Sequence, residues 1–421
     1  MYSIERHLAS VVERRAKSSK SILLTGARGV GKSTLFRHVF QDVRQVTFDD
    51  GLLLCQATDD VGLFLMNHPA PLMIDEIQKC PAMIVRLKLE LDNTDEHEAF
   101  LLTGSQRLRL MEGLSESLAG RVSIVEMNGL SLREINHVDF HRHFVPTQEY
   151  IAERETCLKQ LNEDIWTTIH RGSYPELYSD PAPEWHDYYR SYVRTFLERD
   201  VNRQIRACNQ LTFVKFMTTI AARTGQVLNY KAVADQVGVS EGTVKNWVSI
   251  LEESGLVYLL KPYTASSLNR AIKSPKLYFR DTGLCCYLTR WLTPETLKYG
   301  MMAGAMFETF VVNEILKSCS NEGLDDDLDL FFYKSRDRRI RKVDGAWEGV
   351  AREIKLIIQE GEVLHPIEIR TSTMPKVEMA AEFDVLNDLP DKQRGMGAIV
   401  CLIDRKLYLR ENLVALPLWY I

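Results

Sequence analysis

The stretch Gly26-Ala27-Arg28-Gly29-Val30-Gly31-Lys32-Ser33 has the spacing G-x-x-x-x-G-K-S and follows an apolar run at residues 22–24. Glycines at this spacing let backbone N–H groups turn inward and cradle phosphate oxygens. Lys32 then supplies a positive charge to the β and γ phosphates, and the Ser33 hydroxyl can ligate Mg²⁺. A helix that begins near Thr34 would point its positive end at the same anion. The stretch therefore predicts an ATP-binding loop whose contacts come from Gly26, Ala27, Arg28, Gly29, Val30, Gly31, Lys32, Ser33 and Thr34.

A second apolar segment, residues 71–74, ends in two adjacent acids, Asp75 and Glu76. Phosphoryl transfer from ATP depends mostly on positioning and charge neutralisation, so a metal-holding acid and a water-orienting acid are expected. Asp75 would hold Mg²⁺ through its water shell, and Glu76 would polarise the attacking water. The alternative, a buried strand that ends in a solvated acidic turn, is weaker because two adjacent acids are poor neighbours without a cation. We therefore predict metal roles for Ser33 and Asp75, and catalytic roles for Glu76 and Lys32.

A third apolar segment, residues 100–103, is followed by Gly104, Ser105 and Gln106. A polar side chain at the end of this strand can reach the γ phosphate or the attacking water, which is the role called sensor 1. Ser105 and Gln106 are both candidates, and their spacing does not choose between them. A strand predicted at residues 45–48 lies between the two Walker strands. Together with Glu76 it favours the ATP-hydrolysing branch of P-loop proteins, which inserts an extra strand, over the kinase-like branch.

The composition is ordinary for a globular chain of 421 residues, which is long enough for roughly two to four domains. The net charge of −5 gives no overall attraction to nucleic acid or anionic membranes, so such binding requires a local patch. We find no membrane-spanning run and no signal peptide at the start. The eight cysteines are scattered without a C-x-x-C pair, which favours reduced thiols over a disulfide or zinc framework. These features predict a cytoplasmic protein without a membrane partner.

The pattern of strands and helices divides the chain into four parts. Residues 1–140 alternate strands and helices and hold all the phosphate chemistry, which predicts an α/β domain with a mostly parallel sheet. Residues 141–225 are helical and resemble a lid, residues 226–295 contain a winged helix-turn-helix, and residues 296–421 form a second α/β domain.

The helix-turn-helix prediction rests on helices at 231–237 and 241–253 around a turn at 238–240, where Ser240 is a good N-cap. Alternating strands at 255–260 and 276–279 follow like a wing. One interpretation is DNA binding through the second helix. That helix is net negative and has no arginine for guanine or phosphate, so a dimerisation or regulatory module is the alternative.

Two further basic features have open interpretations. Arg121 follows the predicted helix tail at residues 116–120. It could contact the γ phosphate of a neighbouring subunit as an arginine finger, or it could complement the charge of the helix C-terminus. A basic stretch at residues 336–342 could touch a nucleic-acid backbone or could be a solvated loop.

Several strings resemble the prokaryotic AAA-superfamily P-loop ATPases that carry a C-terminal domain of unknown function, composed of a winged helix and a PD-(D/E)XK nuclease-like fold. The string Asp75-Glu76-Ile77-Gln78-Lys79-Cys80-Pro81 is specific to this group. The resemblance implies an ASCE/AAA-like ATPase domain, ATP and Mg²⁺ at the residues named above, and a functional Arg121. The other matching strings lie at residues 24–33, 48–50, 102–106, 117–121, 197–201, 278–284 and 366–369.

The C-terminal domain departs from the pattern of its apparent relatives. Such nuclease-like tails usually present Glu-Ile-Asp, an apolar strand and then Glu-x-Lys, where Asp and Glu hold Mg²⁺ and Lys orients the water. Here Lys355 stands where the Asp is expected, Glu368 is kept, and Arg370 replaces the Lys. A cation at the metal position repels Mg²⁺, and losing an acid weakens a site that depends on oxygen ligands. Asp344 is an alternative ligand if an insertion realigns the strands.

These features together predict an ATP hydrolase that couples nucleotide state to a winged helix and an inactive nuclease-like module. Two other functions stay open: an ATP-switched DNA-binding regulator or defence component, and an ATP-driven metal-dependent nuclease. Besides ATP, the candidate partners are nucleic acid, another protein and further copies of the chain.

Overall fold

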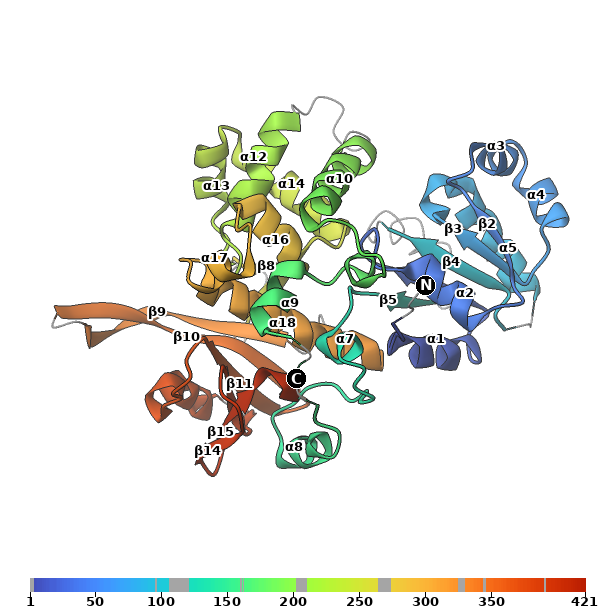
Figure 1. Cartoon of the computed structure of the whole chain (residues 1–421). Coiled ribbons are helices and arrows are strands. Elements are labelled where there is room, and N and C mark those ends of the chain that lie inside the picture. Colours follow the sequence, from blue (N-terminus) through green and yellow to red (C-terminus); the bar gives the residue numbers. More distant parts are fainter. Residues whose placement is uncertain are drawn as a thin grey trace.

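The computed structural model describes residues 4–94, 97–105, 121–159, 161, 163–201, 210–263, 274–324, 330–343, 346–389 and 391–421. Within these ranges the chain forms two main sheets joined by a largely helical middle part (Figure 1). None of the helices described there has both the length and the apolar character needed to cross a membrane.

In the described residues the N-terminal sheet has five strands in the order β2-β3-β4-β1-β5, and every neighbouring pair is parallel. Because the strands are parallel, the carboxyl ends of all of them meet at one edge of the sheet. The strands are β1 (Ser21–Thr25), β2 (Arg44–Thr47), β3 (Leu72–Asp75), β4 (Phe100–Gly104) and β5 (Val122–Glu126).

Strand β4, and not the strand predicted at residues 45–48, separates the two Walker strands β1 and β3. The predicted strand corresponds to β2, which forms the edge of the sheet next to β3. A central strand of a parallel sheet is covered on both faces and has to be apolar. All residues of β4 are buried, whereas Arg44 and Gln45 of β2 are exposed. The inserted strand is therefore present, but a different segment supplies it.

Helices cover both faces of the N-terminal sheet. Successive strand residues point to opposite faces, so Ile22 and Leu24 pack with α1 and α2, while Leu23 packs with the helices of the other face. Figure 1 shows the resulting three layers, with α3, α4 and α5 on the outer side. The helices are α1 (Leu8–Ala16), α2 (Lys32–Val39), α3 (Gly51–Asp59), α4 (Val61–Asn67) and α5 (Pro81–Asn93).

The middle part begins after β5 and is mainly helical. Its first helices are α7 (Leu132–Ile135), α8 (Gln148–Glu155), α9 (Ile165–Arg171), α10 (Trp185–Phe196) and α12 (Gln210–Ala221). Helices α13 (Tyr230–Val237) and α14 (Glu241–Glu253) follow, and then the antiparallel strands β7 (Val257–Pro262) and β8 (Lys276–Phe279). The two helices and two strands expected between residues 231 and 279 are therefore present.

The C-terminal sheet is mixed. Strand β7 pairs in parallel with β9, so the β7–β8 ribbon continues into this sheet, whose described part has ten strands. Both sheets confirm the predicted α/β fold class. The remaining strands are β6 (Gln226–Val227), β9 (Leu330–Val343), β10 (Ala346–Glu360), β11 (Val363–Arg370), β12 (Gln393–Arg394), β13 (Gly397–Cys401), β14 (Leu407–Arg410) and β15 (Leu413–Pro417).

Helix α18 (Ala303–Glu322) joins the two sheets, with α16 (Thr282–Thr289) and α17 (Pro294–Lys298) before it. Its residues from 306 to 321 are buried. The Glu314 carboxylate accepts a hydrogen bond from the Leu132 N–H at 2.6 Å, and Lys317 Nζ donates to the Leu130 carbonyl at 2.8 Å. Buried polar groups need such partners, so these bonds hold the segment that follows β5 against α18.

Candidate functional site

The loop between β1 and α2 folds as the G-x-x-x-x-G-K-S spacing requires. Gly26 has φ +140°, and a Cβ atom there would lie 2.1 Å from the Met127 carbonyl oxygen. A side chain at this position is therefore excluded by both conformation and space. Lys32 is 7% exposed, and its Nζ donates hydrogen bonds to the carbonyls of Gly26 and Ala27, both at 2.9 Å. The ammonium group thus lies against the inner rim of the loop, within reach of an anion bound there.

Asp75, at the end of β3, organises the hydroxyl groups around it. Ser33 Oγ, in the first turn of α2, donates to Asp75 Oδ1 at 2.6 Å. Thr103 Oγ1, near the end of β4, donates to the same oxygen. Thr47 Oγ1, at the end of β2, lies 3.5 Å from Asp75 Oδ2. Mg²⁺ prefers hard oxygen ligands, so a carboxylate next to a hydroxyl fits this ion. Ser33 and Asp75 are the residues that could hold it.

Glu76 lies beside this pair in an unusual backbone conformation, with φ +59°. Non-glycine residues adopt this left-handed conformation where the surrounding structure enforces it. The Glu76 Oε2 atom accepts hydrogen bonds from Gln78 Nε2 and, at 3.3 Å, from Ser105 Oγ. The Glu76 N–H donates to Thr103 Oγ1 at 3.2 Å. The side chains of Ser105, after β4, and Gln78, in the turn after β3, therefore fix the direction of the Glu76 carboxylate.

Of the two sensor candidates, Ser105 is brought to the site, and Gln106 lies outside the described residues. Sequence reasoning missed Gln78 and Thr103 as supporting residues. Gln78 could have been found, because it belongs to the group-specific string after Asp75. In the same string, the Lys79 ammonium forms an ion pair with Asp49 and lies 3.3 Å from the Phe48 carbonyl. This contact ties the turn after β3 to the end of β2.

Arg121 lies at the opposite edge of the sheet from the loop. It directly precedes β5, and the register pairs Val122 with Ser21, the first residue of β1. The length of the five-residue strand β1 therefore separates Arg121 from the loop, which is about 15 Å. The Arg121 Nε atom donates to Asp92 Oδ1 at 2.5 Å, and both side chains are about two-fifths exposed. Arg121 thus does not join the acidic and basic groups around Lys32 in its own chain.

A second cluster of charged groups lies between β8, α18 and β10. Lys276 Nζ lies 3.1 Å from Glu308 Oε1 and 2.5 Å from Glu353 Oε1. Lys355 Nζ lies 2.9 Å from Glu308 Oε2 and 3.6 Å from Glu353 Oε1. Burial would raise the pKa of Glu353, but the Lys276 and Lys355 ammonium groups outweigh it and hold this pKa at about 2. We call these four residues with Glu368 the lysine–glutamate cluster.

Glu368 is the most buried of the three carboxylates in the lysine–glutamate cluster. It is 3% exposed, and its Oε1 atom lies 2.9 Å from Arg370 Nε. Burial raises its pKa to about 7, although Arg370 and Lys355 act in the opposite direction. Desolvation of the carboxylate thus outweighs its cationic neighbours.

Glu368→Gln is expected to stabilise the protein at pH 8 and to change little at pH 5. The folded protein keeps the Glu368 proton between the ordinary pKa near 4.5 and the raised value of about 7, whereas the unfolded chain releases it. Stability from this group is therefore fully present below pH 4.5 and is lost as the pH rises to 7, by roughly 3 kcal/mol. Thermal melts of both proteins from pH 5 to 8 measure this, and a stability difference that does not change with pH would contradict the expectation.

In the ranges that the structure describes, no group of three or more His, Cys, Asp or Glu side chains could hold a metal ion. Asp344, the alternative ligand, lies outside the described residues. Glu308 was not predicted as a member of the lysine–glutamate cluster, because it lies on α18, which comes well before β10 and β11 in the chain.

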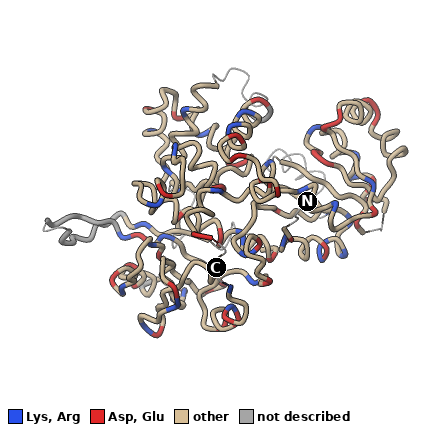
Figure 2. The backbone as a smooth tube through the Cα atoms, viewed as in Figure 1, with Lys and Arg blue, Asp and Glu red and all other residues tan. Residues whose placement is uncertain are grey.

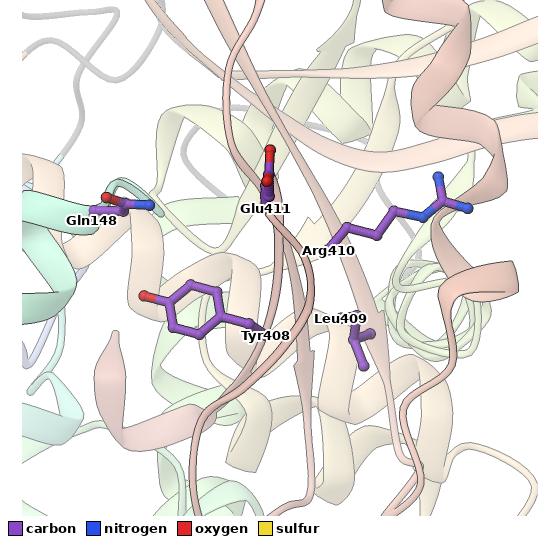
Figure 3. A pocket seen from close by; sticks show the side chains of 5 residues that line it. All are labelled: Gln148, Tyr408, Leu409, Arg410 and Glu411. Atoms are coloured by element: carbon purple, nitrogen blue, oxygen red, sulfur yellow. The ribbon is translucent and has the colours of Figure 1, made fainter.

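An open hollow of about 680 Å³ lies between the start of α8 and strand β14 (Figure 3). Gln148, Tyr408, Leu409, Arg410 and Glu411 line it. None of the residues predicted to contact nucleotide or metal is among them, and the lining offers a single carboxylate. The loop between β1 and α2 therefore remains the candidate functional site.

Comparison with known families agrees with this geometry. Residues 18–136, which contain β1 to β5 and the loop, match the model of the AAA domain family. This segment is therefore similar to AAA-type ATPase domains, and we refer to it as the AAA-type domain. Residues 162–295 and 303–421 of the protein match two families that are each described as a domain of unknown function (DUF8612 and DUF4143).

Uncharacterized proteins of Mycobacterium tuberculosis and Mycobacterium bovis are each 30% identical to the chain over 318 residues. The match covers 74% of this chain and 66% of each relative, so it spans slightly less than two thirds of their length. An uncharacterized protein of Methanocaldococcus jannaschii is 23% identical over 338 residues, which cover 72% of this chain and 69% of the relative.

Two solved structures resemble the chain at low sequence identity. A Walker-type ATPase of Pyrococcus abyssi is 14% identical, with a TM-score of 0.39, and the match covers 68% of this chain and 96% of that one. A signal transduction ATPase with a tetratricopeptide repeat sensor from Pyrococcus horikoshii is 10% identical, with a TM-score of 0.24. That match covers 74% of this chain and 47% of the other.

Proposed function

We propose that the protein is a Mg²⁺-dependent ATP hydrolase that couples nucleotide state to its C-terminal half. One observation carries the proposal: Lys32, the Ser33–Asp75 pair and the oriented Glu76 meet at one edge of the parallel sheet. This group supplies the positive charge, the hard oxygen ligands and the oriented carboxylate that phosphoryl transfer requires.

Each residue has a separate task in this proposal. Lys32 would release the loop carbonyls and contact the β and γ phosphates, which carry more negative charge than a carbonyl oxygen. Mg²⁺, when bound by Ser33 and Asp75, would offset the charge that develops on the phosphates. Glu76 would orient the attacking water and accept its proton, and its bonds to Gln78 and Ser105 fix its direction before ATP arrives.

We propose that α13, α14, β7 and β8 act as a winged helix that transmits nucleotide state and does not read DNA. Lys245 is the single cation of α14, and it pairs with Glu241 one turn earlier at 2.8 Å. DNA-reading helices usually present arginine or lysine to guanine and phosphate. Figure 2 shows acidic and basic residues interspersed along the described chain.

We propose that the C-terminal domain is a nuclease-like fold without nuclease activity. The Lys355 ammonium lies between Glu308 and Glu353, the position where a cation would neutralise these acids. Lys276 adds a second ammonium from β8, and both lysines are largely buried. The carboxylates are therefore already paired, and a divalent ion would have to displace two permanent partners.

The protein is expected to cut neither linear nor supercoiled DNA with Mg²⁺ or Mn²⁺. Gel analysis of both substrates after prolonged incubation measures this. Glu368→Ala and Asp344→Ala serve as controls for a contaminating enzyme, because neither change affects a contaminant. Cutting by the wild type that disappears in either variant would mean that the nuclease site is active.

Phosphate release from ATP tests the proposed function directly. We expect turnover that requires Mg²⁺, stops with EDTA and is unchanged by duplex DNA. Turnover that rises several-fold with DNA would instead favour the ATP-switched DNA-binding regulator.

A cytoplasmic location is part of the proposal, because the seven cysteines in the described ranges are all free thiols.

A further inference from the structure

The turn that ends α14 lies directly against the nucleotide-binding loop. Gly255 has φ +68°, and a Cβ atom at this residue would lie 3.1 Å from the Ala27 backbone nitrogen and 3.4 Å from its Cα atom. Real Cβ contacts are seldom so short, so only glycine allows this approach without movement of the loop. A backbone segment far from the AAA-type domain in sequence therefore contacts the second residue of the loop.

Arg280 provides a second contact from the same part of the chain. Its Nη1 atom donates to Glu126 Oε1, at the end of β5, at 2.6 Å and to Asn128 Oδ1, just after β5, at 2.7 Å. The side chains of Arg280 and Glu126 are 14% and 16% exposed, so water screens this pair only partly. The Arg280 N–H donates to the Leu256 carbonyl at 3.0 Å, which joins it to the turn around Gly255. Both contacts thus come from one connected unit.

A chain of hydrogen bonds also links Arg280 to Val30, farther along the same loop, through Asn128 and Arg6. Arg6 Nη2 donates to the Asn128 carbonyl at 2.6 Å, and Arg6 Nη1 donates to the Val30 carbonyl at 2.8 Å. The buried Glu134 carboxylate holds the Arg6 guanidinium through an ion pair of 3.0 Å. The loop is therefore supported at Ala27 by Gly255 and at Val30 by a chain of bonds that begins at Arg280.

We infer that Gly255 and Arg280 are positioning residues for nucleotide binding, which hold the phosphate-binding loop from outside the AAA-type domain. This inference rests on the proposed function and specifies which contacts couple nucleotide to the C-terminal half. The loop binds phosphate with backbone N–H groups, so its affinity depends on keeping their directions. Coupling of this kind is reciprocal: if docking of α14 strengthens nucleotide binding, nucleotide strengthens docking by the same factor.

Gly255→Ala, compared with Gly238→Ala, separates this role from general stability. Gly238 also has a left-handed backbone, with φ +87°, but a Cβ atom there meets nothing within 4 Å. Both substitutions place alanine in a left-handed backbone conformation, so both should lower the melting temperature, and Gly255→Ala adds the close contact with Ala27. Gly255→Ala should raise the Kd for a fluorescent ADP analogue by about 10-fold, while Gly238→Ala should leave it unchanged.

Arg280→Gln and Arg280→Lys provide a second test that does not depend on the glycine variants folding. Arg280→Gln should weaken binding of the ADP analogue, and Arg280→Lys should recover part of the affinity because it keeps the charge opposite Glu126. Unchanged Kd values in folded Gly255→Ala and Arg280→Gln, with normal wild-type binding, would overturn the inference and leave the proposed function standing. Failure of the wild type to bind the analogue would overturn the proposed function and the inference with it.

Discussion

Glu76→Gln is expected to keep nucleotide binding and to lower ATP turnover by about 10²–10⁴-fold. Glutamine has the size of glutamate and can still accept a hydrogen bond from Gln78 or Ser105, so the site should keep its shape. It cannot take a proton from the attacking water, and this is the step that the substitution removes. Steady-state phosphate release and binding of an ADP analogue, measured on the same protein, separate the two effects.

Lys32→Ala provides the complementary control, because it should abolish nucleotide binding and turnover together. Its ammonium is the charge that the loop offers to the phosphates, and alanine offers none. Near-normal hydrolysis by Glu76→Gln would remove Glu76 from its catalytic role, whatever Lys32→Ala does.

Arg121→Ala is expected to lower turnover sharply if Arg121 serves a neighbouring chain, by roughly 10³–10⁵-fold in the strongest cases. Arg121 lies at the far edge of its own sheet, so it reaches a γ phosphate only in a second copy of the protein. Mixing Arg121→Ala with Glu76→Gln should then restore some activity, because one interface in the mixed assembly has both intact groups. Phosphate release across a range of mixing ratios measures this.

Asp92→Ala is the informative control for Arg121. If Arg121 only pairs with Asp92, both substitutions remove the same ion pair and should have the same small effect. If Arg121 acts as a finger, Asp92→Ala leaves it available and turnover should persist. Arg86→Ala, which breaks a similarly exposed ion pair with Glu90 on α5, controls for changes in surface charge. Absence of rescue at every ratio, with both variants still assembling, would contradict action between chains.

The sequence predicts the fold class and the nucleotide-binding loop because both depend on local patterns. Phosphate-binding glycines, a lysine and a serine follow one another along eight residues, and the strands before and after them are short apolar runs. The order of the strands was missed, although the polar Arg44 and Gln45 of β2 suit an edge strand better than the apolar residues of β4 do. The difference in their burial arises from packing on both faces of the sheet.

Contacts between distant segments could not be read from spacing. Gln78 and Ser105 meet at Glu76 although 27 residues separate them, and Glu308 meets Lys355 across the interface between α18 and β10. The approach of Gly255 to Ala27 is of the same kind, because a glycine after a helix usually serves only as its C-terminal cap. The catalytic and metal roles of Lys32, Ser33, Asp75, Glu76, Ser105 and Arg121 stay predictions.

The most direct test of the central claim is a calorimetric titration of the wild-type protein with a non-hydrolysable ATP analogue in Mg²⁺. We predict one nucleotide bound per chain, with binding that weakens when Mg²⁺ is removed and is lost in Lys32→Ala. Absence of binding by the wild type, or equal binding by folded Lys32→Ala, would contradict the assignment of the loop at residues 26–33 as the ATP site.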